Sequence, residues 1–205
     1  MTGTVLVAVL AGGRGSRLGG AKPTVPLGEL PLIAHPLAAA REAALDAVVV
    51  AKPQTPLPPL ECDVIYERAA GYHPLHGLLA ALAEAAARSP DCACVALACD
   101  MPFVSASLLS WLARAGRVGT GEGGQRNALV TRANGHLQPL LARYFPDHRA
   151  ALDEALRRGQ SLTAAAESLR PQIAGERQLR RFGDPARLCF SVDSDDDLQR
   201  AGRLL

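Results

Sequence analysis

The chain has 205 residues, and its 22 Lys and Arg residues against 20 Asp and Glu residues leave a net charge of +2 at pH 7. With 48% hydrophobic and 20% charged residues, it can fill a buried core, which disordered chains cannot. The near-neutral charge and the 4% of aromatic residues argue against nucleic acid as a partner. No apolar run reaches the about 20 residues that would span a membrane, which argues against a membrane as a partner.

An apolar run at residues 5–10 opens the chain and is followed directly by a glycine-rich turn. It begins without a basic lead and ends in glycines, which is the pattern of a buried strand and not of an export signal. The five cysteines are an odd number, which argues against a disulfide framework and for a reducing, cytoplasmic location. Cys92 and Cys94 are predicted to be small buried side chains on a strand, because no second ligand pair stands at zinc spacing.

Short apolar runs bounded by turn residues alternate along the chain with alanine-rich stretches of helical spacing. Residues 116–124 are predicted to be a mobile connection, since five of these nine residues are glycine. The predicted strands are residues 5–10, 47–50, 63–66, 95–98 and 127–131. The predicted helices are residues 32–45, 75–87, 105–115 and 149–158, with residues 137–144 turning into a further helix.

Strands that alternate with helices at this interval predict an α/β fold with a mostly parallel sheet and helices on both faces. Ser105, Ser161 and Ser194 stand where N-caps of helices are expected. Ligands of such sheets bind beyond the carboxyl ends of the strands. Functional residues are therefore expected directly after the predicted strands.

The first such position is the segment Leu10-Ala11-Gly12-Gly13-Arg14-Gly15-Ser16-Arg17-Leu18-Gly19, followed by Lys22. It fits neither the Walker loop nor the dinucleotide-binding fingerprint. Glycines let backbone N–H groups approach phosphate oxygens closely, and basic side chains neutralise the phosphate charge. The two glycines alone would suit a plain turn, but with Arg17 and Lys22 the segment predicts a phosphate-binding loop.

Two carboxylates stand in comparable places further along the chain. Asp100 directly follows the strand at 95–98, where it could hold Mg²⁺ together with substrate phosphates or, alternatively, cap a helix. Asp193 precedes the predicted N-cap Ser194 and is a candidate second metal ligand. The Asp residues at 195–197 are explained by the helix dipole, which favours acidic side chains in a first turn.

The segment His73-Pro74-Leu75-His76-Gly77-Leu78 marks a helix entrance, because Pro is favoured in a first turn. A ligand can approach the N-terminus of such a helix. His73 and His76 are candidate acid–base groups there, although solvated loop histidines fit the pattern as well. Both interpretations stay open at the level of sequence.

Together these segments resemble the signature blocks of the molybdenum cofactor guanylyltransferases, a family of nucleotidyltransferases. The family's opening block, L-A-G-G-x-S-x-R-M-G-x-D-K, is similar to residues 10–22, with one inserted residue before the Ser. Its C-D-x-P block is present at residues 99–102, and its G-P-L-x-G block appears at residues 73–77. Gln138-Pro139-Leu140 is similar to the family's Q-P-L, where the second substrate enters.

The resemblance implies one nucleotidyltransferase domain over residues 1–205, with a three-layer, Rossmann-like sheet of the glycosyltransferase-A type. Its N-terminal part would bind the nucleotide and its C-terminal part the acceptor. The implied reaction transfers GMP from GTP to the terminal phosphate of molybdopterin cofactor and releases pyrophosphate, with Mg²⁺ as the cofactor. Molybdoenzyme chaperones or cofactor-insertion proteins are expected as further partners.

The same resemblance implies roles for individual residues. Arg17, Lys22 and Asp100 would act in catalysis, the two cations by clamping the leaving pyrophosphate and Asp100 by binding Mg²⁺. Asp193 is the second expected metal ligand and, with Gln138 and Pro139, an expected contact of the acceptor. Glu67 would contact the base or the ribose. The residues expected to bind the nucleotide are Leu10, Ala11, Gly12, Gly13, Lys22, Glu67 and Asp100.

The chain departs from the family pattern at several positions. Ala21 replaces the Asp before the lysine, Ala51 replaces an Asn after the strand at 47–50, and His73 replaces the first Gly of its block. The segment Ser191-Val192-Asp193-Ser194 occupies the place of the family's C-terminal N-x-N-T block. It is closer to the D-x-D-T block of cytidylyltransferases. Two alternatives stay open: a cytidylyltransferase or other nucleotidyltransferase with a different phosphorylated acceptor, and a non-catalytic chaperone that binds a nucleotide or cofactor.

Overall fold

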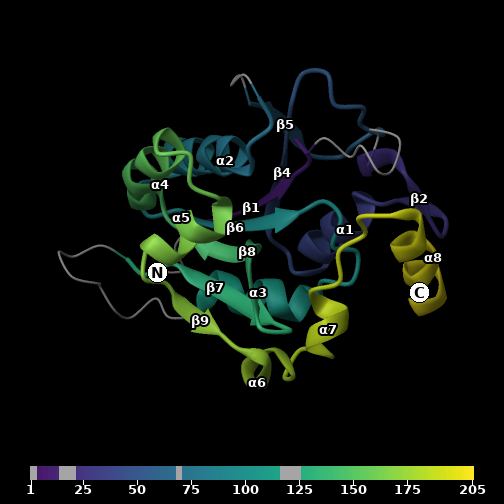
Figure 1. The fold of residues 1–205 in the computed structure, drawn as a ribbon. Helices are drawn as coiled ribbons and strands as arrows, with labels where there is room; N and C mark the ends of the chain where they lie inside the picture. Colours follow the sequence, from purple (N-terminus) through teal and green to yellow (C-terminus); the bar gives the residue numbers. More distant parts are fainter. Residues whose placement is uncertain (1–3, 14–21, 68–70, 116–125) are drawn as a thin grey trace.

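The computed structural model describes residues 4–13, 22–67, 71–115 and 126–205. Within these residues, seven strands form one sheet in the order β5-β4-β1-β6-β8-β7-β9 (Figure 1). The strands are β1 (Val5–Leu10), β4 (Asp46–Ala51), β5 (Asp63–Tyr66), β6 (Ala93–Ala98), β7 (Leu129–Ala133), β8 (His136–Tyr144) and β9 (Gln172–Ala174).

The sheet is parallel except at one strand. β1 pairs in parallel with β4 and β6, and β4 pairs in parallel with β5. β8 is antiparallel to both of its neighbours, β6 and β7, while β7 pairs in parallel with β9. Six of the seven strands described in this sheet therefore run in one direction, which confirms the mostly parallel sheet.

Helices cover both faces of this sheet (Figure 1). The two faces of β1 belong to different core clusters, because side chains alternate along a strand: Leu6 and Ala8 point into one cluster, Val7 and Val9 into the other. The first cluster is covered by α2 (Pro74–Arg88), α4 (Arg149–Arg157) and α5 (Leu162–Ser168). The second is covered by α1 (Ala34–Glu42), α3 (Ala106–Arg114), α6 (Glu176–Leu179) and α7 (Pro185–Leu188).

A third, smaller apolar cluster lies beside the carboxyl edge of the sheet. It joins a hairpin of β2 (Pro26–Leu27) and β3 (Leu30–Pro31) to α8 (Asp195–Leu204), the C-terminal helix. Its fully buried members are Leu27, Leu32, Val192 and Ala201. The short 3₁₀-helix η2 (Lys22–Thr24) leads into this cluster at Val25, whose carbonyl accepts a hydrogen bond from the N–H of Leu32, and the N–H of Ile33 donates to the carbonyl of Pro23 within η2.

Most of the predicted elements are present, with ends shifted by a few residues. The N-caps are confirmed: the hydroxyls of Ser105, Ser161 and Ser194 each accept a hydrogen bond from the backbone N–H three residues later. Since Ser105 caps α3, Asp100 does not cap that helix. The predicted connection at residues 116–124 lies outside the described residues. No described helix is long and apolar enough to cross a membrane.

The helix predicted at residues 137–144 is wrong, because this segment is the antiparallel strand β8. β8 lies between two other strands and under helices on both faces, so its last four residues are all fully buried. Strands buried on both faces show no alternation of polar and apolar residues, and periodicity cannot distinguish them from buried helices. Pro139 stands close to a shift of register against β7 between Val130 and Thr131, which is where a strand tolerates proline.

His148, at the end of the 3₁₀-helix η4 (Pro146–His148), ties three segments together inside the protein. Its Nδ1 accepts a hydrogen bond from the N–H of Phe145 at 3.1 Å, so Nε2 carries the proton and donates to the carbonyl of Arg126 at 2.6 Å. Burial lowers the pKa of His148 below its ordinary value of 6.5, and the Arg126 and Arg143 guanidiniums act in the same direction. In the charged form of His148, the proton on Nδ1 would point at the N–H of Phe145, which now donates to that atom.

We expect the free energy of unfolding to fall as the pH drops below about 6.5. Below that pH, His148 takes up a proton in the unfolded chain but stays neutral in the folded protein. The stabilisation from neutral His148 is complete above that pH and is lost toward its lowered folded-state pKa. Urea unfolding of the wild type and of His148→Gln at pH 7.5 and pH 5.5 measures the effect. The variant should lose less stability between the two values, and an equal loss in both proteins would contradict the assignment to His148.

Candidate functional site

Backbone hydrogen bonds continue past the carboxyl ends of the central strands and fix the segments that follow them. The residues after β1, β5 and β6 are thereby held side by side, as the parallel sheet predicts. The bonds run from the N–H of Ala11 to Val50, of Glu67 to Ala51, of Cys99 to Leu10 and of Val192 to Asp100, at 2.8–3.1 Å.

A cavity of about 390 Å³ opens at this edge of the sheet. All of the predicted nucleotide-binding residues line it, together with Asp193 from the segment before α8. The lining residues are Leu10, Ala11, Gly12, Gly13, Lys22, Glu67, Tyr72, His73, Pro74, Gly77, Ala98, Cys99, Asp100, Leu140 and Asp193.

Lys22 joins the two predicted metal ligands. Its Nζ donates to Oδ2 of Asp100 at 2.5 Å and to Oδ1 of Asp193 at 2.7 Å. Lys22 and Asp100 are nearly buried, whereas the Asp193 side chain is 56% exposed. Residues far apart in the sequence therefore meet at one point, with one ammonium between two carboxylates.

Burial and charge act in opposite directions on this cluster. Burial raises the pKa of Asp100, and the Lys22 ammonium opposes that rise. Burial lowers the pKa of Lys22, but Asp100 and Asp193 together more than offset it, so the lysine pKa lies above its ordinary value. Lys22 is thus an ammonium at neutral pH. The second oxygen of Asp100, Oδ1, is buried and has no hydrogen-bond partner among the described residues.

A second lysine pairs with the other buried carboxylate of the cavity. The Nζ of Lys52 lies 3.0 Å from Oε1 of Glu67, and the two side chains are only 4% and 5% exposed. The same ammonium lies 5.2 Å from the centre of the Tyr72 ring, within range of a cation–π interaction. One carboxylate oxygen of Glu67 is thereby committed to Lys52, which fixes the orientation of the group.

Two glycines make room for this carboxylate. A Cβ at Gly12 would stand 2.8 Å from Oε1 of Glu67, which is closer than real contacts allow. A Cβ at Gly77 would stand 3.0 Å from the Leu10 side chain and 3.4 Å from Oε2 of Glu67. A side chain at residue 12 would therefore have to displace the Glu67 carboxylate from its ion pair with Lys52, and close packing also favours glycine at residue 77.

The N-terminus of α2 forms another wall of the cavity. His73 is its N-cap, and its Nδ1 accepts a hydrogen bond from the N–H of Leu75 at 3.2 Å. Aligned peptide dipoles favour negative charge at such an end, so this wall suits an anionic ligand. His73 lines the cavity and His76 does not. The capping bond gives His73 a structural role, and acid–base chemistry by either histidine stays a prediction.

Three predicted residues are not part of the described cavity lining. Arg17 lies outside the described residues. Gln138 and Pro139 lie on β8 and do not line the cavity, although the next residue, Leu140, does. Pro139 is buried, and its carbonyl accepts a hydrogen bond from the Tyr144 hydroxyl at 2.9 Å. Their roles at the acceptor stay predictions.

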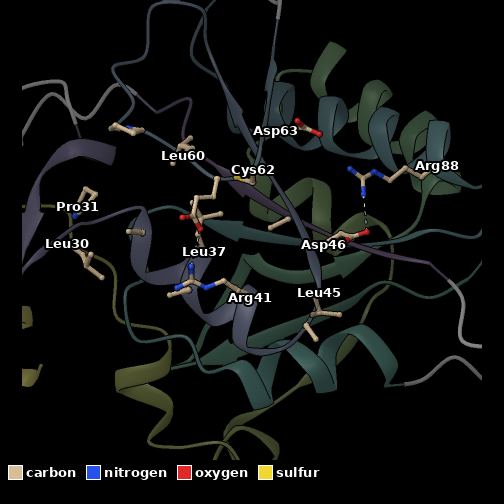
Figure 2. A pocket seen from close by; sticks show the side chains of 16 residues that line it. Leu30, Pro31, Leu37, Arg41, Leu45, Asp46, Leu60, Cys62, Asp63 and Arg88 are labelled. Atoms are coloured by element: carbon tan, nitrogen blue, oxygen red, sulfur yellow. Dashed lines mark hydrogen bonds and ion pairs between the residues drawn. The ribbon is translucent and has the colours of Figure 1, made fainter.

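A larger hollow of about 970 Å³ lies at the amino ends of β4 and β5 and along α1 (Figure 2). Its two arginines are both paired: Arg41 lies 3.1 Å from Glu61, and Arg88 lies 3.6 Å from Asp46. Because these cations already have carboxylate partners and the hollow shares no lining residue with the smaller cavity, size alone does not make it the candidate site.

The sequence analysis missed the part that Lys52 plays at this site. Part of the signal was present, because Lys52 stands two residues after the predicted strand at residues 47–50, where functional residues of a parallel sheet are expected. A second signal is composition: Lys22 and Lys52 are the two lysines of the whole chain. Tyr72 and Leu140 had no comparable signal, since each is placed by the folded chain.

A family model described as the MobA-like NTP transferase domain matches residues 7–182. The chain belongs to this family. A relative from Pelotomaculum thermopropionicum named "Probable molybdenum cofactor guanylyltransferase" is 29% identical over 194 residues, which are 94% of this chain and 89% of the relative. A relative of the same name from Mycobacterium tuberculosis is 31% identical over 192 residues, with 88% and 89% covered. The resemblance seen in the sequence motifs is confirmed.

Solved structures show the same fold. Molybdopterin-guanine dinucleotide biosynthesis protein A from Archaeoglobus fulgidus is similar with a TM-score of 0.77 and 26% identity, and 97% of each chain is covered. The cytidylyltransferase for 2-C-methyl-D-erythritol 4-phosphate from Thermus thermophilus has a TM-score of 0.65 at 19% identity, with 100% of this chain and 98% of that chain covered. The second likeness concerns the fold alone.

Replacing Lys52 by Met is expected to destabilise the protein by about 3–5 kcal/mol, because removing one partner leaves the buried Glu67 charge uncompensated. Urea unfolding followed by circular dichroism measures the loss. The double variant Lys52→Met/Glu67→Gln should recover part of it, since the charge is then gone. Arg41→Met is the matched control, because its pair with Glu61 is 75% and 90% exposed. A Lys52→Met protein as stable as this control would contradict the prediction.

Proposed function

We propose that this chain is a molybdenum cofactor guanylyltransferase, which transfers GMP from GTP to the terminal phosphate of molybdopterin cofactor. The observation that carries the proposal is the cavity in which Lys22 lies between Asp100 and Asp193 beside the turn at Gly12 and Gly13. This combination of a glycine-rich turn, an ammonium and two carboxylates suits a triphosphate with its metal ion. Relatives of that name over most of the chain support the choice of substrates.

The reaction is one displacement at phosphorus. An oxygen of the acceptor phosphate forms a bond to the α-phosphorus of GTP, and the bond from that phosphorus to the bridging oxygen breaks. The electron pair leaves with pyrophosphate. A phosphate oxygen is already a deprotonated nucleophile, so the protein needs no general base. Its residues have to position the two substrates and stabilise negative charge.

The cavity offers a group for each of these tasks. The backbone at Gly12 and Gly13 lets the phosphates approach β1 closely, because no side chain stands in the way. Lys22 supplies a compact positive charge for the leaving pyrophosphate. Glu67, held by Lys52, accepts hydrogen bonds from the base or the ribose with the oxygen that the ion pair leaves over. The N-terminus of α2 adds a favourable dipole.

Asp100 and Asp193 would hold Mg²⁺, and their chemistry fits that ion. Mg²⁺ binds through one or two carboxylates and takes its other ligands from water and substrate phosphates. Among the described residues, no group of three or more His, Cys, Asp and Glu side chains could hold a metal ion by itself. The unpartnered Oδ1 of Asp100 is an acceptor aimed at nothing else in the described chain. Bound there, Mg²⁺ would stabilise charge on the α-phosphate and the leaving group.

The decisive test is turnover with each of the four labelled nucleoside triphosphates, Mg²⁺ and molybdopterin cofactor. We expect pyrophosphate release with GTP. Release with CTP alone would favour a cytidylyltransferase, to which the segment at residues 191–194 has some likeness. Binding without release for all four nucleotides would favour a non-catalytic nucleotide-binding protein and contradict the proposal.

Replacing Asp100 by Asn is expected to lower kcat by about 10²–10³-fold, because several kcal/mol of charge stabilisation in the transition state depend on the metal that it would hold. Steady-state pyrophosphate release at saturating Mg²⁺ measures the change, and circular dichroism checks the fold. Asp195→Asn is the matched control, since Asp195 is exposed in the first turn of α8. Full activity of Asp100→Asn would refute the metal assignment.

A further inference from the structure

The Lys22 ammonium stands where the two candidate metal ligands converge. Its Nζ lies 2.5 Å from one oxygen of Asp100 and 2.7 Å from one oxygen of Asp193, so it uses the same pair of groups that would hold Mg²⁺. An oxygen ligand of Mg²⁺ lies about 2.0–2.1 Å from the ion. An ion that bound both of these oxygens would compete with Nζ for them. An ion that bound the unpartnered Oδ1 of Asp100 instead would still lie on the same carboxylate as the ammonium, where two positive charges repel each other.

The buried Asp100 carboxylate explains why a cation is needed at this point. A charge taken out of water is costly unless another charge compensates it, and the Asp100 side chain is only 15% exposed. Lys22 meets this need from inside the chain. The η2 helix that carries Lys22 is fixed by the cluster of the β2–β3 hairpin and α8, so the ammonium is held close to the carboxylates.

The same cavity offers the ammonium an alternative partner. Lys22 lines it together with Gly12, Gly13 and the first turn of α2, which are the walls suited to phosphate oxygens. The lysine side chain is a flexible stem of four carbons, so Nζ can exchange one oxygen partner for another while the backbone stays in place.

We propose that Lys22 competes with a divalent metal ion for Asp100 and Asp193, and yields its place when the phosphates of a nucleotide bind its ammonium. The metal ion alone then binds weakly, and metal and nucleotide bind tightly only together. This inference rests on the proposed function for the identity of the second ligand, a nucleoside triphosphate. It assigns Lys22 a part in ordering the binding steps, in addition to its contact with the leaving group.

Binding of Mn²⁺ alone, measured as free ion by electron paramagnetic resonance, tests the competition without any turnover. We expect Lys22→Met and Lys22→Gln to bind Mn²⁺ at least about tenfold more tightly than the wild type, which corresponds to about 1.4 kcal/mol. Arg41→Met removes one positive charge far from the site and should leave the Kd for Mn²⁺ unchanged. Equal or weaker binding by the folded Lys22 variants would overturn the proposal.

A second measurement uses the wild type and does not depend on the variants folding. Because the chain has two lysines, ¹³Cε-labelled lysine gives two Cε–Hε signals, and Lys52 serves as the internal reference. We expect Mg²⁺ with α,β-methylene-GTP to shift the Lys22 signal, and Mg²⁺ alone at the same concentration to leave it in place. A Lys22 signal that is unmoved in the complex would show that the ammonium keeps its carboxylates, and the proposal would be wrong.

The two proposals can fail separately. Tight Mn²⁺ binding by the Lys22 variants without turnover of any nucleotide would support the competition and contradict the transferase. Pyrophosphate release from GTP by a wild type whose Lys22 variants bind Mn²⁺ no better would support the transferase and contradict the competition.

Discussion

Carboxylates buried at the carboxyl edge of the sheet have to be compensated by cations, and this requirement determines how the candidate site is built. Glu67 follows β5 and Asp100 follows β6, and each is paired with one of the chain's two lysines. The other 20 of the 22 basic residues are arginines. An ammonium is a compact point charge, whereas a guanidinium is a wide planar fork. The smaller cation therefore stands beside these two nearly buried carboxylates.

These pairs also connect parts of the chain that the sheet alone would leave apart. Asp193 reaches Lys22 because the N–H of Val192 donates to the carbonyl of Asp100, while the Val192 side chain is buried with Leu27 and Ala201. The hairpin and the C-terminal helix consequently share one small core, and a backbone hydrogen bond ties this core to the segment that follows β6. A candidate site that takes its glycine-rich turn from near the start of the chain thus depends for its second carboxylate on residues near the end.

The sequence predicted the parts that local patterns determine. The buried strand before Gly12, the serine N-caps and the position of Asp100 after a strand follow from short apolar runs and capping rules, and all are observed. β8 could not be predicted in this way, because a strand buried on both faces lacks alternation. The Lys52–Glu67 pair depends on which strands are neighbours, and that information is absent from any single segment. Long-range placement explains both errors.

The departure from the family pattern at Ala51 has a structural counterpart one residue later. Ala51 is buried in the core on the side of α1 and α3, whereas Val50 before it faces α2. Because side chains alternate along a strand, residue 52 returns to the α2 side, where Glu67 lies against Gly77. Lys52 therefore provides a polar group at the end of β4, where the family pattern has an Asn, and this group is positively charged. Its ion pair uses Oε1 of Glu67, so this lysine determines which oxygen of the carboxylate is left for another partner.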